Sequence, residues 1–471
     1  MAVAPPVTRA IPALPFASPE QLDPRLEELL AGASAQLSRW LASATSRPPL
    51  PQLALIPEVS PQATGLEPMR LLADLQLVMD GAYNPNHPGA LAHLDPPPLL
   101  ASIAADMVCA GLNNNLLAEE LSPSLSRLER SLCTWLAEAV GLPDGSGGVP
   151  ASGGSLSNLM ALVTARVSRG LQHCSEAVVL ASADAHVSLG KALMVMGLPP
   201  EALRRVAVDA NGRLDVAALD EQLASCQQQG IPVLSVVATA GTTVRGAVDP
   251  LPQIAALCRR YGIWLHVDGA IGAVYALAGD HALRVEGLGL ADSLTVNPQK
   301  LLGITKTSSL LLLAQPELLH RAFATGLPYM ESSWGGGHGG ECGLQGTRPA
   351  EILKLWLGLR QLGLSGIQAI VDGAIERRRT LARLLAPAAG LQLRQGCLHL
   401  LAMTPHAQSA VAADHWSLTT RQQLLEAQLM LSRPVYQGRH HLKAVLGNPH
   451  TSETQLERLA SIVTASLGEC S

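Results

Sequence analysis

Short apolar runs alternate with amphipathic helical patterns from about residue 143 to residue 313, and this alternation limits the chain to few folds. The runs predicted as strands are 177–182, 204–209, 233–240, 263–269, 292–297 and 308–313. The helices predicted between them are 153–169, 186–196, 215–229 and 250–261. Strands that alternate with helices indicate an α/β domain whose mainly parallel sheet is covered on both faces.

The segments before and after this block lack its regular alternation of strands and helices. Helical patterns precede it at 21–43, 67–79 and twice within 99–141, where Ser122 before Pro123 is a candidate helix cap. A long helix is predicted from about 349 and another from about 367, followed by mixed strand and helix patterns. We therefore expect an N-terminal helical and extended segment (1–85), a large domain (86–365) and a small C-terminal α+β domain (366–471).

Composition excludes several classes of protein. The net charge is −5 and no run of Lys and Arg is present, which argues against a nucleic-acid partner. No apolar stretch is long enough for a membrane span, and the N-terminus lacks the pattern of a signal peptide. The eight cysteines have no metal-ligand spacing, so we expect reduced thiols, no metal and a cytoplasmic protein.

Five polar features follow predicted strands or turns, where ligands collect in α/β sheets. Gly154 and Ser155 begin a predicted helix in "ASGGSLSNLMAL", and free N–H groups there attract an anion such as phosphate. The others are His186, Thr243, Asp268 and Lys300. Taken singly, the glycine turn could be only a cap, His186 a packed histidine and Lys300 a surface lysine at a strand end.

The combination is more specific than its parts, because it matches the needs of pyridoxal phosphate. The phosphate of this cofactor needs an anion site, its pyridine nitrogen needs a carboxylate, and its aldehyde needs a lysine for the Schiff base. An imidazole such as that of His186 can stack on the ring. The sequence therefore predicts a pyridoxal phosphate site around Lys300.

Several blocks resemble the pyridoxal-phosphate-dependent amino-acid decarboxylases of group II, which act on glutamate, cysteine sulfinate, diaminobutyrate or aromatic amino acids. "HVDGAIGA" and "ADSLTVNPQKLLG" are similar to the HVDAA and ADS…NPHK motifs of that family. Further blocks that match in order are "NNNLLAEELSPSLSRLE", "SGGSLSNLMALVTAR", "SADAHVSLGKA" and "LGNPHTSETQLERL". The resemblance covers roughly residues 86 to 465 and implies the fold type I architecture of pyridoxal-phosphate-dependent transferases.

The resemblance also implies roles for individual residues. Lys300 would form the Schiff base, Asp268 would pair with the pyridine nitrogen, and His186 would stack on the ring and assist proton transfer. Gly154, Ser155 and Asn297 would hold the phosphate, with Thr243 near the cofactor or the substrate carboxylate. Tyr329, in "RAFATGLPYMESS", would protonate the product carbon from a mobile loop, although it could be an ordinary loop tyrosine.

Three positions depart from the family pattern. Gln299 stands where the family usually has histidine before the lysine, which puts cofactor affinity in question. Gly269 replaces an alanine, which is a minor change. Lys443 stands where relatives commonly have an arginine for the substrate carboxylate, so the positive charge remains but the bidentate fork is lost, and Arg439 could compensate.

The substrate is the least determined part of the prediction. We expect an acidic or small polar amino acid (glutamate, aspartate or cysteine sulfinate) first, diaminobutyrate second and an aromatic amino acid third, with Asn114 or Asn115 contacting the side chain. Glu119 and Glu120 could instead favour a cationic side chain. The family implies a homodimer. The alternatives are another fold type I enzyme (aldolase, carbon–sulfur lyase or decarboxylation-dependent transaminase) and a pyridoxal-phosphate-binding protein with little catalysis.

Overall fold

The computed structural model describes residues 15–327, 333–406 and 409–468, and the chain divides into two compact units between Asn84 and Pro85. The first unit contains α1 (Pro24–Ala42), η1 (Ala44–Ser46) and α2 (Pro68–Asp80). The Asp23 side chain caps α1 by accepting from the backbone N–H of Arg25. Among the described helices of both units, none combines the length and apolarity that crossing a bilayer requires.

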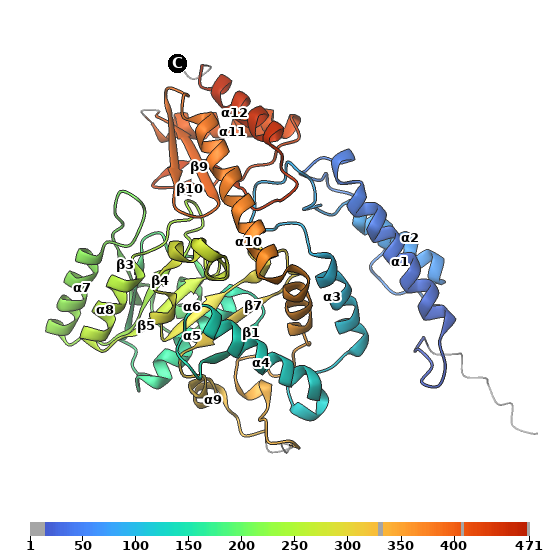
Figure 1. Ribbon diagram of the computed structural model, residues 1–471, viewed down its shortest axis with the longest axis horizontal. Coiled ribbons are helices and arrows are strands. Elements are labelled where there is room, and N and C mark those ends of the chain that lie inside the picture. The colour runs from blue at the N-terminus through green and yellow to red at the C-terminus, as the bar shows by residue number, and fades with distance from the viewer. Residues whose placement is uncertain (1–14, 328–332, 407–408, 469–471) are drawn as a thin grey trace, which may run out of the picture. The chain divides into compact units, whose positions relative to one another are not determined.

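The second unit is built on a seven-stranded sheet with the order β1-β7-β6-β5-β4-β2-β3 (Figure 1). Its strands are β1 (Gly147–Ala151), β2 (Val178–Ser182), β3 (Leu203–Val206), β4 (Val233–Thr239), β5 (Trp264–Gly269), β6 (Ser293–Val296) and β7 (Ser309–Leu313). Strands β3, β2, β4, β5 and β6 pair in parallel, and β7 is antiparallel to both β6 and β1. The predicted mainly parallel sheet is confirmed.

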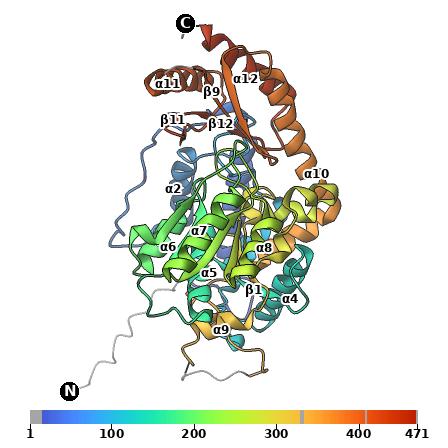
Figure 2. The ribbon, with the colours of Figure 1, turned by 90° about the vertical axis from the view of Figure 1, so that its left-hand side faces the viewer.

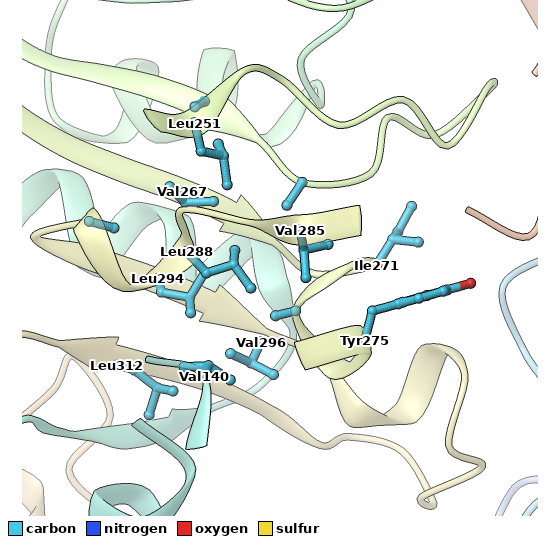
Figure 3. Close-up of a cluster of buried hydrophobic side chains, with 14 of the residues drawn as sticks. Val140, Leu251, Val267, Ile271, Tyr275, Val285, Leu288, Leu294, Val296 and Leu312 are labelled. Carbon is cyan, nitrogen blue, oxygen red and sulfur yellow. The ribbon is translucent and has the colours of Figure 1, made fainter. Parts of the chain in front are cut away.

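Helices cover both faces of this sheet because successive strand residues point to opposite sides. Leu180 packs into the core on the side of α4 (Pro123–Ala139), α7 (Val216–Gln229), α8 (Leu251–Tyr261) and α10 (Ile352–Leu385), while Val179 packs into the core on the side of α5 (Gly154–Ser168), α6 (Ser188–Val195) and α9 (Glu317–Phe323). Helix α3 (Leu100–Leu112) precedes α4 in the chain. Figure 3 shows Leu251 of α8 with Val267, Leu294, Val296 and Leu312 of the strands in the first core.

The last part of the chain forms a second, three-stranded antiparallel sheet with the order β12-β9-β8 (Figure 2). Its elements are β8 (Leu391–Gln395), β9 (Leu400–Pro405), α11 (Ala410–Glu426), β12 (Leu442–Val445) and α12 (Glu453–Ser466), with a hairpin of β10 (Val435–Tyr436) and β11 (Arg439–His440). Trp416 is fully buried in the core between this sheet and its helices, and its indole N–H donates to Ser466. The predicted small α+β region is thus present, whereas the exact boundaries 86–365 and 366–471 stay a prediction.

Most predicted elements form, and the differences have local causes. Strand β1, "GGVPA", was not predicted because Gly and Pro disfavour strands, but its edge position tolerates Pro150. The helices predicted from 349 and 367 are one helix, α10, interrupted at Gly363, whose φ of 57° is not helical. Ser122 occupies the N-cap of α4 with Pro123 after it, but its hydroxyl makes no capping hydrogen bond.

Candidate active site

A cavity of about 200 Å³ lies at the carboxyl ends of β2, β4, β5 and β6, next to the N-terminus of α5. Its lining residues are Gly154, Ser155, Asn158, Asp184, His186, Thr239, Gly241, Thr242, Thr243, Asp268, Ala270, Ile271, Asn297, Gln299 and Lys300. All seven residues predicted to bind the cofactor line this cavity. They come together because parallel strands end at the same edge of the sheet, and each residue ends a strand or follows one.

Asp268, the last residue but one of β5, is held by two hydrogen bonds. The side chain of Asn158 donates to Oδ2 at 2.9 Å, and the backbone N–H of Ala270 donates to Oδ1 at 3.1 Å. Asn158 cannot turn its amide around, because its Oδ1 accepts a hydrogen bond from Thr295 at 2.8 Å. Only 7% of Asp268 is exposed, so its carboxylate is a fixed acceptor aimed at the cavity.

His186 follows β2 and has a defined tautomer. The backbone N–H of Ser188 donates to its Nδ1 at 3.2 Å, so the proton of the neutral ring resides on Nε2. Burial lowers the pKa of His186, an effect that Asp268 opposes and that Lys300 and Lys191 reinforce. The ring is therefore a neutral imidazole near neutral pH.

Lys300 ends the short 3₁₀ turn η7 (Pro298–Lys300) after β6, and it is the one lysine in the cavity lining among the described residues. Burial lowers the pKa of its amine, while the charges of Asp268 and Asp95 oppose that change. A lowered pKa raises the fraction of free amine, which is the nucleophilic form. Lys300 is therefore a buried amine that faces the cavity.

The N-terminus of α5 forms an anion cradle. A side chain at Gly154 would place its Cβ 2.9 Å from Nδ2 of Asn297, so only glycine lets the amide approach this backbone. Asn297 is oriented because its Oδ1 accepts from the Ser309 hydroxyl at 2.7 Å, which leaves Nδ2 as a donor. This amide and the first N–H groups of α5 provide the donors that a phosphate group needs.

Gln299 also lines the cavity, and it has a structural partner. Its Oε1 accepts a hydrogen bond from the backbone N–H of Ser308 at 2.5 Å. Ser308 is 6% exposed, so this N–H depends on Gln299 for an acceptor.

The residues predicted to contact substrate are not in the lining of this cavity. The Asn114 side chain donates to the carbonyl of Leu112, and the Asn115 carbonyl accepts from the N–H groups of Leu117 and Arg348. Lys443 contacts one lining residue, because its ammonium donates to the carbonyl of Thr243 at 3.3 Å. Tyr329 lies outside the described residues.

Glu119, considered above as a partner for a cationic side chain, is 2% exposed and forms an ion pair with Arg130 at 2.9 Å. Its negative charge is therefore already compensated within the chain. Glu120 is exposed.

Asn158 and Asp184 are among the lining residues that were missed from the sequence. Asn158 lies four residues after Gly154 in a helix, so both are on one face, and a polar residue on that face was an available signal. Asp184 precedes His186 by two residues, and nothing in its neighbourhood in the sequence distinguishes it from a solvated loop carboxylate.

Comparisons with known proteins give a match to a family model and to several relatives. The family model "Pyridoxal-dependent decarboxylase conserved domain" matches residues 49–393. The chain is 31% identical over 393 residues to L-2,4-diaminobutyrate decarboxylase of Rhizobium meliloti (strain 1021), covering 80% of this chain and 77% of the relative. It is 30% identical over 361 residues to an acidic amino acid decarboxylase of Mus musculus, covering 73% and 65%.

Solved structures support the fold. The apo form of mouse CSAD superimposes with a TM-score of 0.86 at 24% identity, covering 94% of this chain and 99% of that one. Oryza sativa TDC with PLP and tryptamine gives a TM-score of 0.87 at 21% identity, covering 96% and 99%. The architecture around the cavity is therefore one that other known proteins share.

Proposed function

Because the chain belongs to the pyridoxal-dependent decarboxylase family, we propose that it decarboxylates an L-amino acid with an acidic or short polar side chain. Membership of the family makes it a carboxy-lyase that uses pyridoxal phosphate. The candidate substrates are glutamate, aspartate, cysteine sulfinate and diaminobutyrate. Relatives that act on diaminobutyrate and on acidic amino acids support this choice.

The observation that carries the proposal is that an amine, a fixed carboxylate and an anion cradle line one cavity. Lys300, Asp268 and the Gly154–Asn297 cradle match the three polar groups of pyridoxal phosphate. When bound, this cofactor supplies an aldehyde that joins to amines and a protonated ring that accepts the electron pair left by carbon dioxide. The residues of the cavity thus fit the cofactor of the family.

The chain's own residues would hold and activate these groups. Lys300 would provide the amine that bonds to the aldehyde of the cofactor. Asp268 keeps the proton on the pyridine nitrogen, and Asn158 fixes the direction of that carboxylate. Gly154, Ser155 and Asn297 would bind the phosphate, and Thr243 would lie near the cofactor or the substrate carboxylate.

Proton return to the substrate carbon needs an acid, and the proposal assigns it to Tyr329 or His186. His186 holds a proton on Nε2 because Ser188 donates to its Nδ1, and its neutral ring can also stack on the cofactor. Tyr329 is proposed on the family resemblance alone.

Lys443 is proposed to receive the α-carboxylate of the substrate. Its ammonium points to the cavity wall at Thr243 and is close enough to Lys300 for the two charges to interact. Asn114 and Asn115 are proposed to contact the substrate side chain only in an assembled dimer, because neither lines the cavity of one chain.

The proposed assembly is a homodimer in the cytoplasm. Exposed apolar side chains on α3 provide a surface for a second copy: Leu100, Met107, Val108 and Leu112. The cysteines of the described residues are free, in keeping with a reducing compartment.

The test is a screen of the purified holoenzyme against the common amino acids, cysteine sulfinate and diaminobutyrate, with carbon dioxide and amine both measured. Stoichiometric carbon dioxide and amine from one acidic or short polar substrate is the expected result. An aldolase or a carbon–sulfur lyase would release no carbon dioxide, and a decarboxylation-dependent transaminase would not yield the simple amine. A cofactor spectrum without turnover on any substrate would indicate a binding protein.

We expect substrate affinity to fall at alkaline pH because of Lys443. Burial, reinforced by the charge of Lys300, lowers the pKa of Lys443 to about 8, so the ammonium is present below pH 8 and is lost above it. KM should rise by about tenfold per pH unit beyond this value. Lys443→Arg, whose pKa stays above the range tested, should remove this rise, and pH profiles of KM for both proteins decide the matter. If KM rises equally at alkaline pH in the parent and in Lys443→Arg, the role assigned to Lys443 is contradicted.

Two substitutions of Gln299 should separate its effect on cofactor affinity from its effect on stability. Gln299→Ala leaves the N–H of Ser308 without its acceptor, which should lower stability by about 1–3 kcal/mol. Gln299→Glu keeps an acceptor oxygen but adds a negative charge to the cavity that binds phosphate. Its cofactor dissociation constant should increase at least about tenfold while its melting temperature changes little. Fluorescence titration with the cofactor and thermal unfolding measure the two effects, and unchanged cofactor affinity in Gln299→Glu would refute this role.

A further inference from the structure

The segment 432–443 is a hairpin that touches the cavity wall at two places. Its base is closed by backbone hydrogen bonds between Ser432 and Lys443, at 2.8 and 3.2 Å, and β10 and β11 pair closer to its tip. Lys443 contacts the wall from the base through the carbonyl of Thr243. Tyr436 contacts it from β10, because its hydroxyl donates to Oδ2 of Asp184 at 2.7 Å.

The Tyr436 hydroxyl is the centre of a small polar cluster. It accepts from Nη1 of Arg245 at 3.5 Å and from Nε2 of Gln437 at 3.4 Å. Arg245 is 5% exposed and is also held by the carbonyl of Ala210. Burial raises the pKa of Tyr436, so its hydroxyl keeps the proton that it donates. Nothing in the proposed chemistry uses this cluster, although Asp184 lines the cavity.

Lys443 needs such an anchor more than an arginine would. Its ammonium is a point charge on a flexible stem, and the one hydrogen bond found for it among the described residues is the 3.3 Å contact with Thr243. In the described part of the chain, its backbone pairs with β9 and with Ser432, within the same small sheet and hairpin. The Asp184–Tyr436 hydrogen bond ties that hairpin to the loop after β2, which carries His186.

We propose that Asp184 and Tyr436 are positioning residues that hold the hairpin 432–443 against the cavity wall and so place Lys443 for the substrate carboxylate. This inference rests on the proposed function of Lys443. The pair acts on the binding of the amino acid and not on the bond-breaking step, because neither side chain has a part in proton or electron transfer. Its loss therefore changes KM and leaves kcat and cofactor affinity in place.

The test compares Tyr436→Phe, Asp184→Ala and Asp184→Asn in the holoenzyme. Tyr436→Phe and Asp184→Ala remove the hydrogen bond and should raise KM by roughly fivefold to tenfold, with kcat within about twofold of the parent. The dissociation constant of the amino acid, measured from the absorbance change of the bound cofactor, should rise in parallel. Asp184→Asn retains an acceptor oxygen for the Tyr436 hydroxyl and should recover most of the loss.

A matched control is Tyr261→Phe, which removes another tyrosine–aspartate hydrogen bond, the 2.6 Å contact with Asp220 between α8 and α7. KM should not change in this variant. In a Lys443→Ala background, Tyr436→Phe should raise KM no further, because both changes remove one function.

The outcomes separate the two claims. If Lys443→Ala leaves KM unchanged, the proposed function of Lys443 fails. If Lys443→Ala raises KM but Tyr436→Phe does not, the inference fails. It also fails if Tyr436→Phe raises KM by the same factor in the Lys443→Ala background as in the parent. The inference is also overturned if Tyr436→Phe lowers kcat and cofactor affinity but leaves KM unchanged. The same holds if Tyr436→Phe does not fold and Asp184→Ala folds with the KM of the parent.

Discussion

Lys300→Ala should abolish turnover, with kcat/KM falling at least about a thousandfold, and should remove the absorbance of the imine between cofactor and enzyme. The physical reason is that, within the described residues, no other lysine lines the cavity, so no second amine can take over. The chain has only five lysines, at 191, 300, 306, 354 and 443. Borohydride reduction of the native holoenzyme followed by peptide mapping should therefore place the cofactor on Lys300 without ambiguity.

Lys191→Ala is the control for this experiment, because Lys191 is an exposed lysine on α6. It should retain both the absorbance and turnover close to the parent. Turnover in Lys300→Ala, or a reduced cofactor that maps to Lys306 or Lys443, would show that the assignment of the reactive amine is wrong.

The residues that the sequence analysis brought together are those at the ends of strands. His186, Asp268 and Lys300 are far apart in the chain, but each lies at or just after the end of a parallel strand, and the geometry of such sheets places the carboxyl ends side by side. A pattern in the sequence was sufficient here because the sheet does the positioning.

Contacts between a helix and a strand, or between the two sheets, could not be predicted from the ends of strands. Asn158 reaches Asp268 from a helix 110 residues away, and Tyr436 reaches Asp184 across 252 residues from a different sheet. Neither contact follows from periodicity, because the angle between helix and sheet and the docking of the C-terminal sheet decide it. Asn114 and Asn115 show the converse, since neither lines the cavity of the single chain, and their contact with the substrate stays a prediction.

Asp268→Asn should lower kcat by at least about a hundredfold, which is the second largest effect we expect. A neutral amide cannot hold a proton on the pyridine nitrogen by charge, so the ring loses its capacity to accept electrons. The substitution also conflicts with the local hydrogen bonds. The NH2 group of Asn158 donates to one oxygen of Asp268, and the N–H of Ala270 donates to the other. The NH2 group of an asparagine at position 268 would therefore face one of these two donors.

Asp249→Asn separates this chemistry from the general cost of altering a buried carboxylate. Asp249 is 2% exposed and accepts from the N–H groups of Leu214 and Thr239, both at 2.7 Å, but it does not line the cavity. Burial raises its pKa to about 6, so loss of its negative charge should be tolerated, although the amide NH2 would face one of the two N–H donors and lower stability by about 1–3 kcal/mol, as at Asp268. Steady-state kinetics and thermal unfolding of both variants should show a large kcat loss in Asp268→Asn alone. Equal kcat losses in the two variants would mean that Asp268 supports the fold and not the cofactor.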